Sequence, residues 1–76
     1  MNKTQTIKDI LSFVLNINKD YDFNTLSIDT NMNWDSMKHV TIITAIENEF
    51  DIFIEADDAT SLTSYEKLLN YIESKT

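Results

Sequence analysis

The 76-residue chain contains no cysteine, no glycine and no proline. Without cysteine it can form neither disulfide bonds nor thiolate zinc sites, so any thiol chemistry must come from an added group. Without glycine it cannot form the GxxxxGK(S/T) or GxGxxG loops that bind phosphates. Backbone positions that require φ > 0 should fall mostly to asparagine or aspartate. The candidates between the apolar segments are Asn16, Asn18, Asn24, Asn31 and Asn33.

Basic residues are also scarce. The chain has 6 Lys and Arg against 13 Asp and Glu, which gives a formal net charge of −7. Binding to nucleic acid or to an anionic membrane requires a basic surface, so basic protein partners are favoured instead. No apolar run approaches the ~20 residues of a membrane span, and the N-terminus lacks the apolar stretch of a signal peptide. We therefore expect a cytoplasmic monomer with one domain over residues 1–76.

Apolar residues at three- and four-residue spacing predict three long amphipathic helices. These cover residues 4–17, residues 36–50 and a last segment after Thr63. Phe13 and Leu15 widen the apolar face of the first, which predicts a helix buried between others. Residues 55–61 begin with acidic side chains and suit one or two helical turns docked on the core. The predicted fold class is all-α, a four-helix bundle with three main helices, one short helix and a long first loop.

The connections carry weaker patterns. Asp20, Asp22 and Asn24 copy the first ligand positions of a calcium loop, but the required glycine and the final glutamate are missing, so we expect no metal site. Residues 51–54 alternate like a strand, yet no second strand is available, and we interpret them as an apolar linker. Residues 63–66, Thr-Ser-Tyr-Glu, fit a capping box at the start of the last helix.

The stretch Trp34-Asp35-Ser36-Met37 opens the second long helix. Asp35 is placed to act as its N-cap, which leaves Ser36 at the first helical position with its hydroxyl outward. This pattern alone also fits an ordinary helix start. His39 shares a helical face with Ser36, but a small helical chain without glycine has little means to build an oxyanion hole, so we expect no enzyme and a solvated His39. An exposed hydroxyl at a helix N-terminus is a favourable site for attaching a phosphate.

Four short stretches of the chain stand out together: Met-Asn-Trp-Asp-Ser-Met at 32–37, Ile-Glu-Asn-Glu-Phe at 46–50, Ile-Phe-Ile at 52–54 and the Tyr-Ile finish at 71–72. In this order and spacing they resemble the acyl carrier protein family. The pattern of that family is Leu-Gly-x-Asp-Ser-Leu, followed by a helix that ends in Glu-x-Glu-Phe and by an Ile-x-Ile linker. The resemblance implies that Ser36 carries 4′-phosphopantetheine through a phosphodiester, and that the thiol of this arm holds an acyl group as a thioester. Asp35 would help a phosphopantetheinyl transferase to recognise the site, and acyl-transferring or acyl-activating enzymes would be the other partners.

The chain departs from the family pattern near this serine. Asn33 replaces the glycine, which fits if its backbone has φ > 0. Lys38 and Thr41 occupy positions that are usually acidic in carriers of fatty acid biosynthesis, so we hypothesise a specialised pathway. Trp34 either anchors a partner or folds back over the loop. The residues predicted to contact partners are Trp34, Met37, Lys38, Thr41 and Glu47.

An apolar sleeve for the acyl chain is the last feature we predict. Its candidate residues are Met37, Val40, Ile46, Ile54, Ala59 and Leu62, and the alternative for each is ordinary core packing. Two other functions stay open. One is an aminoacyl or D-alanyl carrier, which differs only in cargo. The other is an unmodified, acidic helical interaction module.

Overall fold

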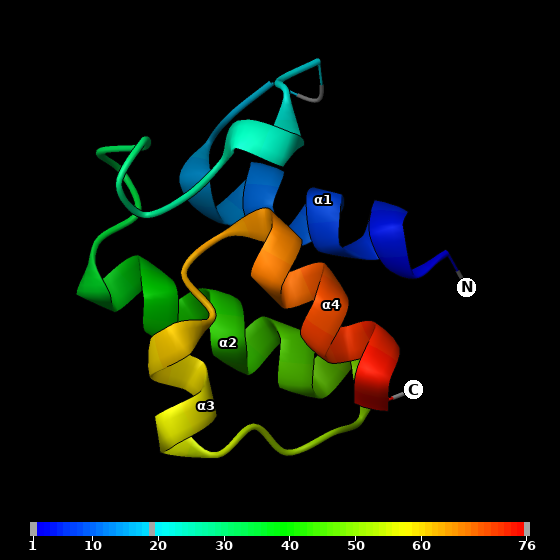
Figure 1. The fold of residues 1–76 in the computed structure, drawn as a ribbon. Coiled ribbons are helices and arrows are strands. Elements are labelled where there is room, and N and C mark those ends of the chain that lie inside the picture. Colours follow the sequence, from blue (N-terminus) through cyan, green and yellow to red (C-terminus); the bar gives the residue numbers. More distant parts are fainter. Residues whose placement is uncertain (1, 19, 76) are drawn as a thin grey trace.

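Helices form the whole framework of the molecule. The computed structural model describes residues 2–18 and 20–75, and within these ranges the chain forms four α-helices and one short 3₁₀ helix (Figure 1). The elements are α1 (Lys3–Leu15), η1 (Phe23–Thr25), α2 (Ser36–Phe50), α3 (Ala56–Ser61) and α4 (Tyr65–Lys75). This confirms the predicted all-α bundle with three long helices and a short one. No helix in the described ranges is both long enough and apolar enough to cross a membrane.

The core lies where α1, α2 and α4 meet. Helix α1 packs against both α2 and α4, and η1 in the first loop packs against α4. Helix α3 lies beside the N-terminal half of α2 (Figure 1). The buried apolar side chains come from every element except α3. They are Ile7, Leu11, Leu15, Phe23, Leu26, Trp34, Ile42, Ile43, Ile46, Ile54, Leu62, Tyr65, Leu68 and Ile72.

Helices α1 and α2 each end at a residue with a left-handed backbone conformation. Asn16 has φ 55° and donates its backbone N–H to the Ser12 carbonyl, so α1 stops before Ile17, earlier than predicted. Asp51 has φ 54° and ends α2 in the same way. Of the residues that the structure describes, these two have positive φ. The expectation that asparagine and aspartate replace glycine is therefore confirmed at these helix ends, where short polar side chains tolerate the left-handed region. It is wrong for the other loop asparagines.

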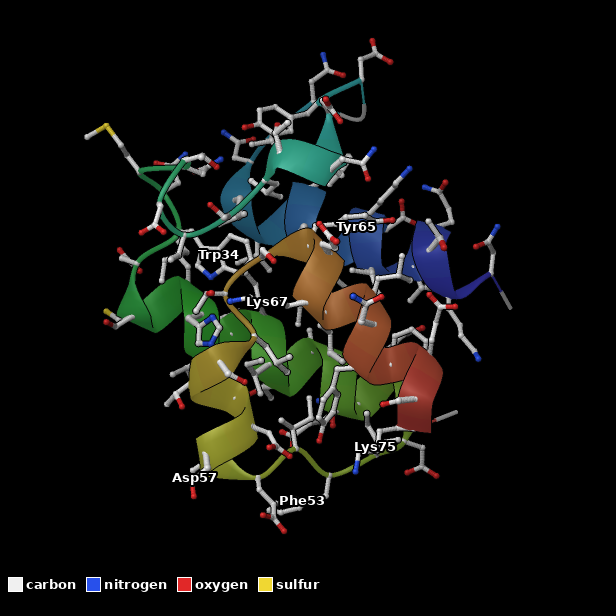
Figure 2. All side chains as sticks on the ribbon, viewed as in Figure 1. Trp34, Phe53, Asp57, Tyr65, Lys67 and Lys75 are labelled. Carbon is white, nitrogen blue, oxygen red and sulfur yellow. The ribbon has the colours of Figure 1, made fainter. Side chains whose placement is uncertain are left out.

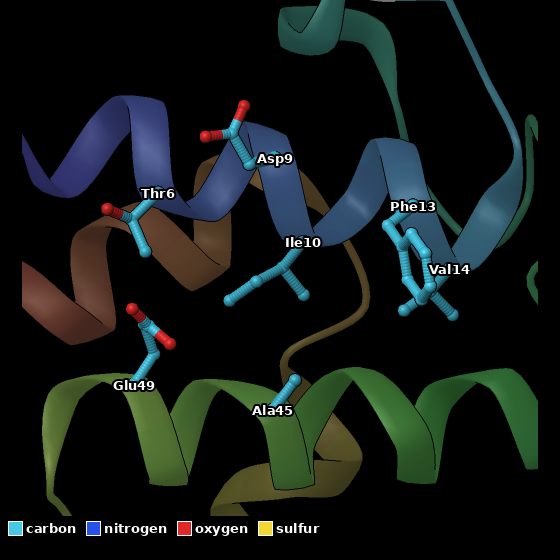
Figure 3. Close-up of a pocket in the computed structure, with 7 residues that line it drawn as sticks. All are labelled: Thr6, Asp9, Ile10, Phe13, Val14, Ala45 and Glu49. Atoms are coloured by element: carbon cyan, nitrogen blue, oxygen red, sulfur yellow. The ribbon is translucent and has the colours of Figure 1, made fainter.

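The prediction that α1 is buried between other helices is wrong for Phe13. Leu15 is 1% exposed, but the Phe13 side chain is 88% exposed. It lies beside a surface groove of about 310 Å³ between α1 and α2 (Figure 3). The groove is lined by Thr6, Asp9, Ile10, Phe13, Val14, Ala45 and Glu49. Within the described residues, the helices that pack most closely on α1 are α2 and α4, so the face of α1 that carries Phe13 stays in solvent.

The start of α4 also differs from the prediction. Ser64, and not Thr63, caps this helix, because the Ser64 hydroxyl accepts the backbone N–H of Lys67 at 3.1 Å. The Thr63 carbonyl accepts the N–H of Ile28 at 2.8 Å, and the N–H of Tyr65 donates to the Leu26 carbonyl at 3.1 Å. These bonds tie residues 63–65 to the first loop, and the helix begins at Tyr65. A capping-box pattern read from local sequence does not include such long-range bonds.

One side-chain hydrogen bond joins α4 to α3. The Tyr71 hydroxyl donates to Asp58 Oδ2 at 3.1 Å. Burial raises the pKa of Tyr71 above its ordinary value of 10.0, and the hydrogen bond to Asp58 and the nearby carboxylates of Asp58, Glu55 and Glu47 raise it further. The native state therefore holds the phenolic proton more tightly than the unfolded chain does. This bond should make stability depend on alkaline pH.

We expect Tyr71→Phe to weaken the loss of stability above pH 10. Because the native pKa is raised, the contribution of Tyr71 is fully present below the unfolded pKa near 10 and is lost as pH rises through the native pKa. At neutral pH the variant should lose about 0.5–1 kcal/mol, the net value of one partly exposed hydrogen bond. Urea unfolding followed by circular dichroism between pH 7 and 11 measures both effects. Asp58→Asn is the control, since it keeps an acceptor oxygen but removes the charge. An unchanged alkaline slope in Tyr71→Phe would contradict the assignment.

Candidate attachment site at the start of helix α2

Asp35 and Ser36 form the first turn of α2 as predicted. Asp35 has extended backbone angles (φ −98°, ψ −174°), and its carboxylate accepts the N–H of Lys38 at 2.9 Å. Its carbonyl accepts the N–H of His39 at 2.8 Å, which begins the helical pattern. Ser36 is the first residue of the helix and is exposed. Its hydroxyl therefore lies at the positive end of a 15-residue helix.

The loop before Ser36 is fixed by asparagine side chains. The N–H of Asn33 donates to Asn31 Oδ1 at 2.9 Å, which forms a tight turn. The Asn33 amide group donates to the Leu15 carbonyl at 3.2 Å, at the end of α1. The prediction that Asn33 takes φ > 0 is wrong, because Asn16 and Asp51 are the only described residues with positive φ. The Asn33 side chain instead anchors the loop to α1.

Trp34 folds back into the molecule. Its side chain is only 2% exposed and lies inside the fold near the start of α2 (Figure 2). The indole N–H donates to His39 Nδ1 at 3.0 Å, and the two rings stack with centroids 6.0 Å apart. Of the two alternatives for Trp34, the exposed partner anchor is wrong and the folded-back position is correct. The position of Trp34 depends on its packing against His39, and no local sequence pattern indicates that packing.

The prediction of a solvated His39 is also wrong. His39 is half-buried, and its Nε2 lies 2.7 Å from the Ala59 carbonyl oxygen in α3. Because Nδ1 accepts the Trp34 N–H, the neutral ring carries its proton on Nε2 and donates it to Ala59. Both ring nitrogens are therefore engaged away from Ser36. The arrangement is not that of a histidine base beside a serine nucleophile.

The other predicted partner residues separate into two groups. Met37 is 81% exposed, and Lys38 and Thr41 are exposed on the turns that follow Ser36. Glu47 is half-buried, and its Oε2 accepts the N–H of Ile54 at 2.8 Å. Its carboxylate thus holds the linker between α2 and α3 in place. Of the residues predicted to contact partners, Glu47 therefore differs from Met37, Lys38 and Thr41 in using its side chain within the fold.

The residues predicted to line the apolar sleeve also separate into two groups, one buried in the core and one at the surface. Ile46, Ile54 and Leu62 are 0%, 4% and 4% exposed and belong to the core. Val40 and Ala59 instead line an apolar groove of about 260 Å³ between α2 and α3. The full lining of this groove, which we call the α2–α3 groove, is His39, Val40, Ile43, Thr44, Ala56, Ala59 and Thr60.

A second hollow lies at the serine and shares one lining residue with this groove. It has a volume of about 390 Å³ and is lined by Ser36, Met37, Val40 and Thr41. Val40 lines both hollows, so apolar surface runs from Ser36 along α2 to α3. The α2 side of this surface was within reach of sequence reasoning, since the spacing of Val40, Ile43 and Thr44 puts them on neighbouring turns. The α3 side depends on how that helix docks.

The chain has relatives among known proteins. No family model matches the chain. The acyl carrier protein of Buchnera aphidicola subsp. Schizaphis graminum is 39% identical over 74 residues, which cover 97% of this chain and 94% of that protein. The chain belongs to the acyl carrier protein family. The acyl carrier proteins of Buchnera aphidicola subsp. Acyrthosiphon pisum (strain 5A) and of Chlorobium phaeobacteroides are 32% and 28% identical and match over 97% and 93% of this chain.

Membership in the acyl carrier protein family supports an acyl carrier role, in which the protein carries a group and does not catalyse its conversion. The structure is consistent with a carried group attached through a phosphate at Ser36. The serine is exposed, and it stands at a helix N-terminus whose backbone N–H groups and dipole favour a phosphate. Asp35 caps the same turn, so the start of the helix is fixed without using the Ser36 hydroxyl as the cap.

Proposed function

We propose that this protein, as one carrier domain over residues 1–76, carries an acyl group on a 4′-phosphopantetheine arm attached to Ser36. One observation carries the proposal. Ser36 is exposed at the first position of α2, directly after a capping aspartate, in a chain that aligns with acyl carrier proteins over nearly its whole length.

The residues around Ser36 fit such an arm. The first turn of α2 favours the phosphate end electrostatically. Met37 and Val40, which are 81% and 64% exposed, offer apolar surface next to the serine. When bound, the arm supplies the thiol that holds an acyl group as a thioester. The chain has no cysteine, so none of its own residues competes with that thiol.

Tethering gives the carrier its physical advantage, because an attached group reaches each partner enzyme at a high effective concentration. The partners in this proposal are a phosphopantetheinyl transferase and acyl-transferring or acyl-activating enzymes. The net charge of −7 favours basic surfaces on them and opposes self-association, in agreement with a monomer. The proposed place of action is the cytoplasm.

The surface next to Ser36 further suggests a specialised pathway. Lys38 and Thr41 are exposed there, and the Glu47 carboxylate is occupied by the Ile54 N–H. A partner that requires carboxylates directly after the serine would find a cation and a hydroxyl instead. Tight, productive loading by the enzymes of housekeeping fatty acid synthesis would contradict this refinement. An aminoacyl or D-alanyl carrier remains the alternative cargo class.

The intact mass of the purified protein tests the proposal. After incubation with coenzyme A and a broad-specificity phosphopantetheinyl transferase, we expect each chain to gain the mass of one phosphopantetheine group. The same mixture without the transferase is the control. No gain in mass would reject the carrier function in favour of an unmodified interaction module. If the arm is attached, a screen of adenylating and acyl-transferring enzymes then identifies the cargo.

A further inference from the structure

The single histidine of the chain joins three segments. His39 belongs to α2, accepts the indole N–H of Trp34 from the loop before Ser36, and donates to the Ala59 carbonyl in α3. The bonds measure 3.0 Å to Trp34 and 2.7 Å to Ala59. Since the indole can only donate, its bond to Nδ1 fixes the proton of the neutral ring on Nε2, where it points to Ala59.

This histidine stands at the α2–α3 groove. His39 and Ala59 both line the groove, and the bond between them spans from its α2 side to its α3 side. Val40, the next residue, lines both the groove and the hollow at Ser36. The His39–Ala59 bond therefore restrains the distance between the two helices close to where a chain from Ser36 would enter.

Besides the His39–Ala59 bond, Ala59 packs against the core, but little of α3 is buried. It has six residues, none of them is buried, and its N-cap residue Glu55 makes no side-chain capping bond. The Tyr71–Asp58 bond ties α3 to α4. An element with little buried surface opens at low free-energy cost, so a single hydrogen bond is a large part of what holds it.

We propose that His39 is the gate of the α2–α3 groove. Its bond to Ala59 holds the groove narrow, and Trp34 keeps the ring in the orientation and tautomer that the bond requires. An acyl chain that enters the groove must break the His39–Ala59 bond, so His39 sets how readily the chain is sheltered. The role of the gate rests on the proposed function, because the chain would arrive from Ser36. His39 acts here as a positioning residue.

Hydrogen exchange on the unmodified protein tests whether the His39–Ala59 bond holds α3 in place. We expect amide exchange in α3 to be about five- to tenfold faster in His39→Leu than in the natural protein, as the loss of one hydrogen bond predicts. His39→Gln should stay near the natural rate, because its amide can both accept from Trp34 and donate to Ala59. Trp34→Phe should fall between, since it removes the N–H but keeps an aromatic ring. Unchanged exchange in His39→Leu would overturn the gate.

A second measurement tests the effect on cargo. Each variant is loaded at Ser36 either from coenzyme A or from octanoyl-coenzyme A, and urea unfolding compares the two forms. We expect octanoylation to stabilise His39→Leu more than the natural protein or His39→Gln, by about fivefold in the unfolding equilibrium constant. A purely structural role for His39 would shift both loaded forms equally. Equal stabilisation in all three proteins, or none in any, would overturn the gate.

The two measurements keep the gate and the carrier function apart. If no arm can be attached to Ser36, the carrier function fails, and with it the sheltering role of His39. The exchange rates would then still report whether His39 holds α3. If the arm is attached but octanoylation does not distinguish the variants, the carrier function stands and the gate alone is wrong.

Discussion

Ser36→Ala is expected to abolish attachment of phosphopantetheine completely. The variant removes the oxygen that forms the phosphodiester, and none of the other serines in the chain directly follows an aspartate. The loss should be all or none in the intact mass, whatever the concentration of the transferase. The helix should survive, because Ser36 is exposed and the cap is supplied by Asp35. We expect the free energy of unfolding to change by no more than about 0.5 kcal/mol.

Ser74→Ala is the matched control for this variant. Ser74 is also exposed in a helix, and its hydroxyl donates to the Tyr71 carbonyl at 2.7 Å. Figure 1 places this end of α4 well away from the start of α2. The control should gain the same mass as the natural protein. A mass gain that persists in Ser36→Ala, in a protein with natural circular dichroism, would place the attachment elsewhere and reject the proposed function.

The sequence predicted the features whose causes are local. The spacing of apolar residues predicted the three long helices, because one buried face at three- and four-residue intervals is a property of the helix itself. The Asp35 cap was also within reach, since its carboxylate bonds an N–H three residues away. Asn16 and Asp51 end their helices through their own backbone angles. Each of these depends on residues within about one helical turn.

The features that sequence reasoning missed depend on distant partners. Trp34 and His39 are five residues apart, but the bond that completes their arrangement reaches Ala59, 20 residues beyond His39. Glu47 accepts from Ile54 only because the linker after α2 turns back. In each case a polar side chain that looked free for partners satisfies a backbone group elsewhere in the fold. Periodicity indicates which face of a helix is buried, but not which loop reaches it.

Ile46→Ala is the second variant with a large expected effect. The sequence predicted both Ile46 and Val40 as residues of the apolar sleeve, but the structure places them differently. Ile46 is 0% exposed in the core, whereas Val40 is 64% exposed beside Ser36. Ile46→Ala should therefore cost about 2–5 kcal/mol. A domain of this length has a total stability of only about 4–11 kcal/mol, so a large part of it would be lost. The midpoint of thermal unfolding should fall by at least about 10 °C.

Val40→Ala is the matched variant, since it also truncates a branched aliphatic side chain on α2. We expect its free energy of unfolding to stay within about 0.5 kcal/mol of the natural value, because little surface is removed from the core. Its effect should appear only after octanoylation, as a smaller stabilisation by the acyl chain, since Val40 lines the path from Ser36 to the α2–α3 groove. Thermal unfolding of the unacylated and octanoylated forms, followed by circular dichroism, measures both variants. If Val40→Ala destabilised the unmodified protein as much as Ile46→Ala does, Val40 would be a core residue. The path along α2 would then not be available to a chain attached at Ser36.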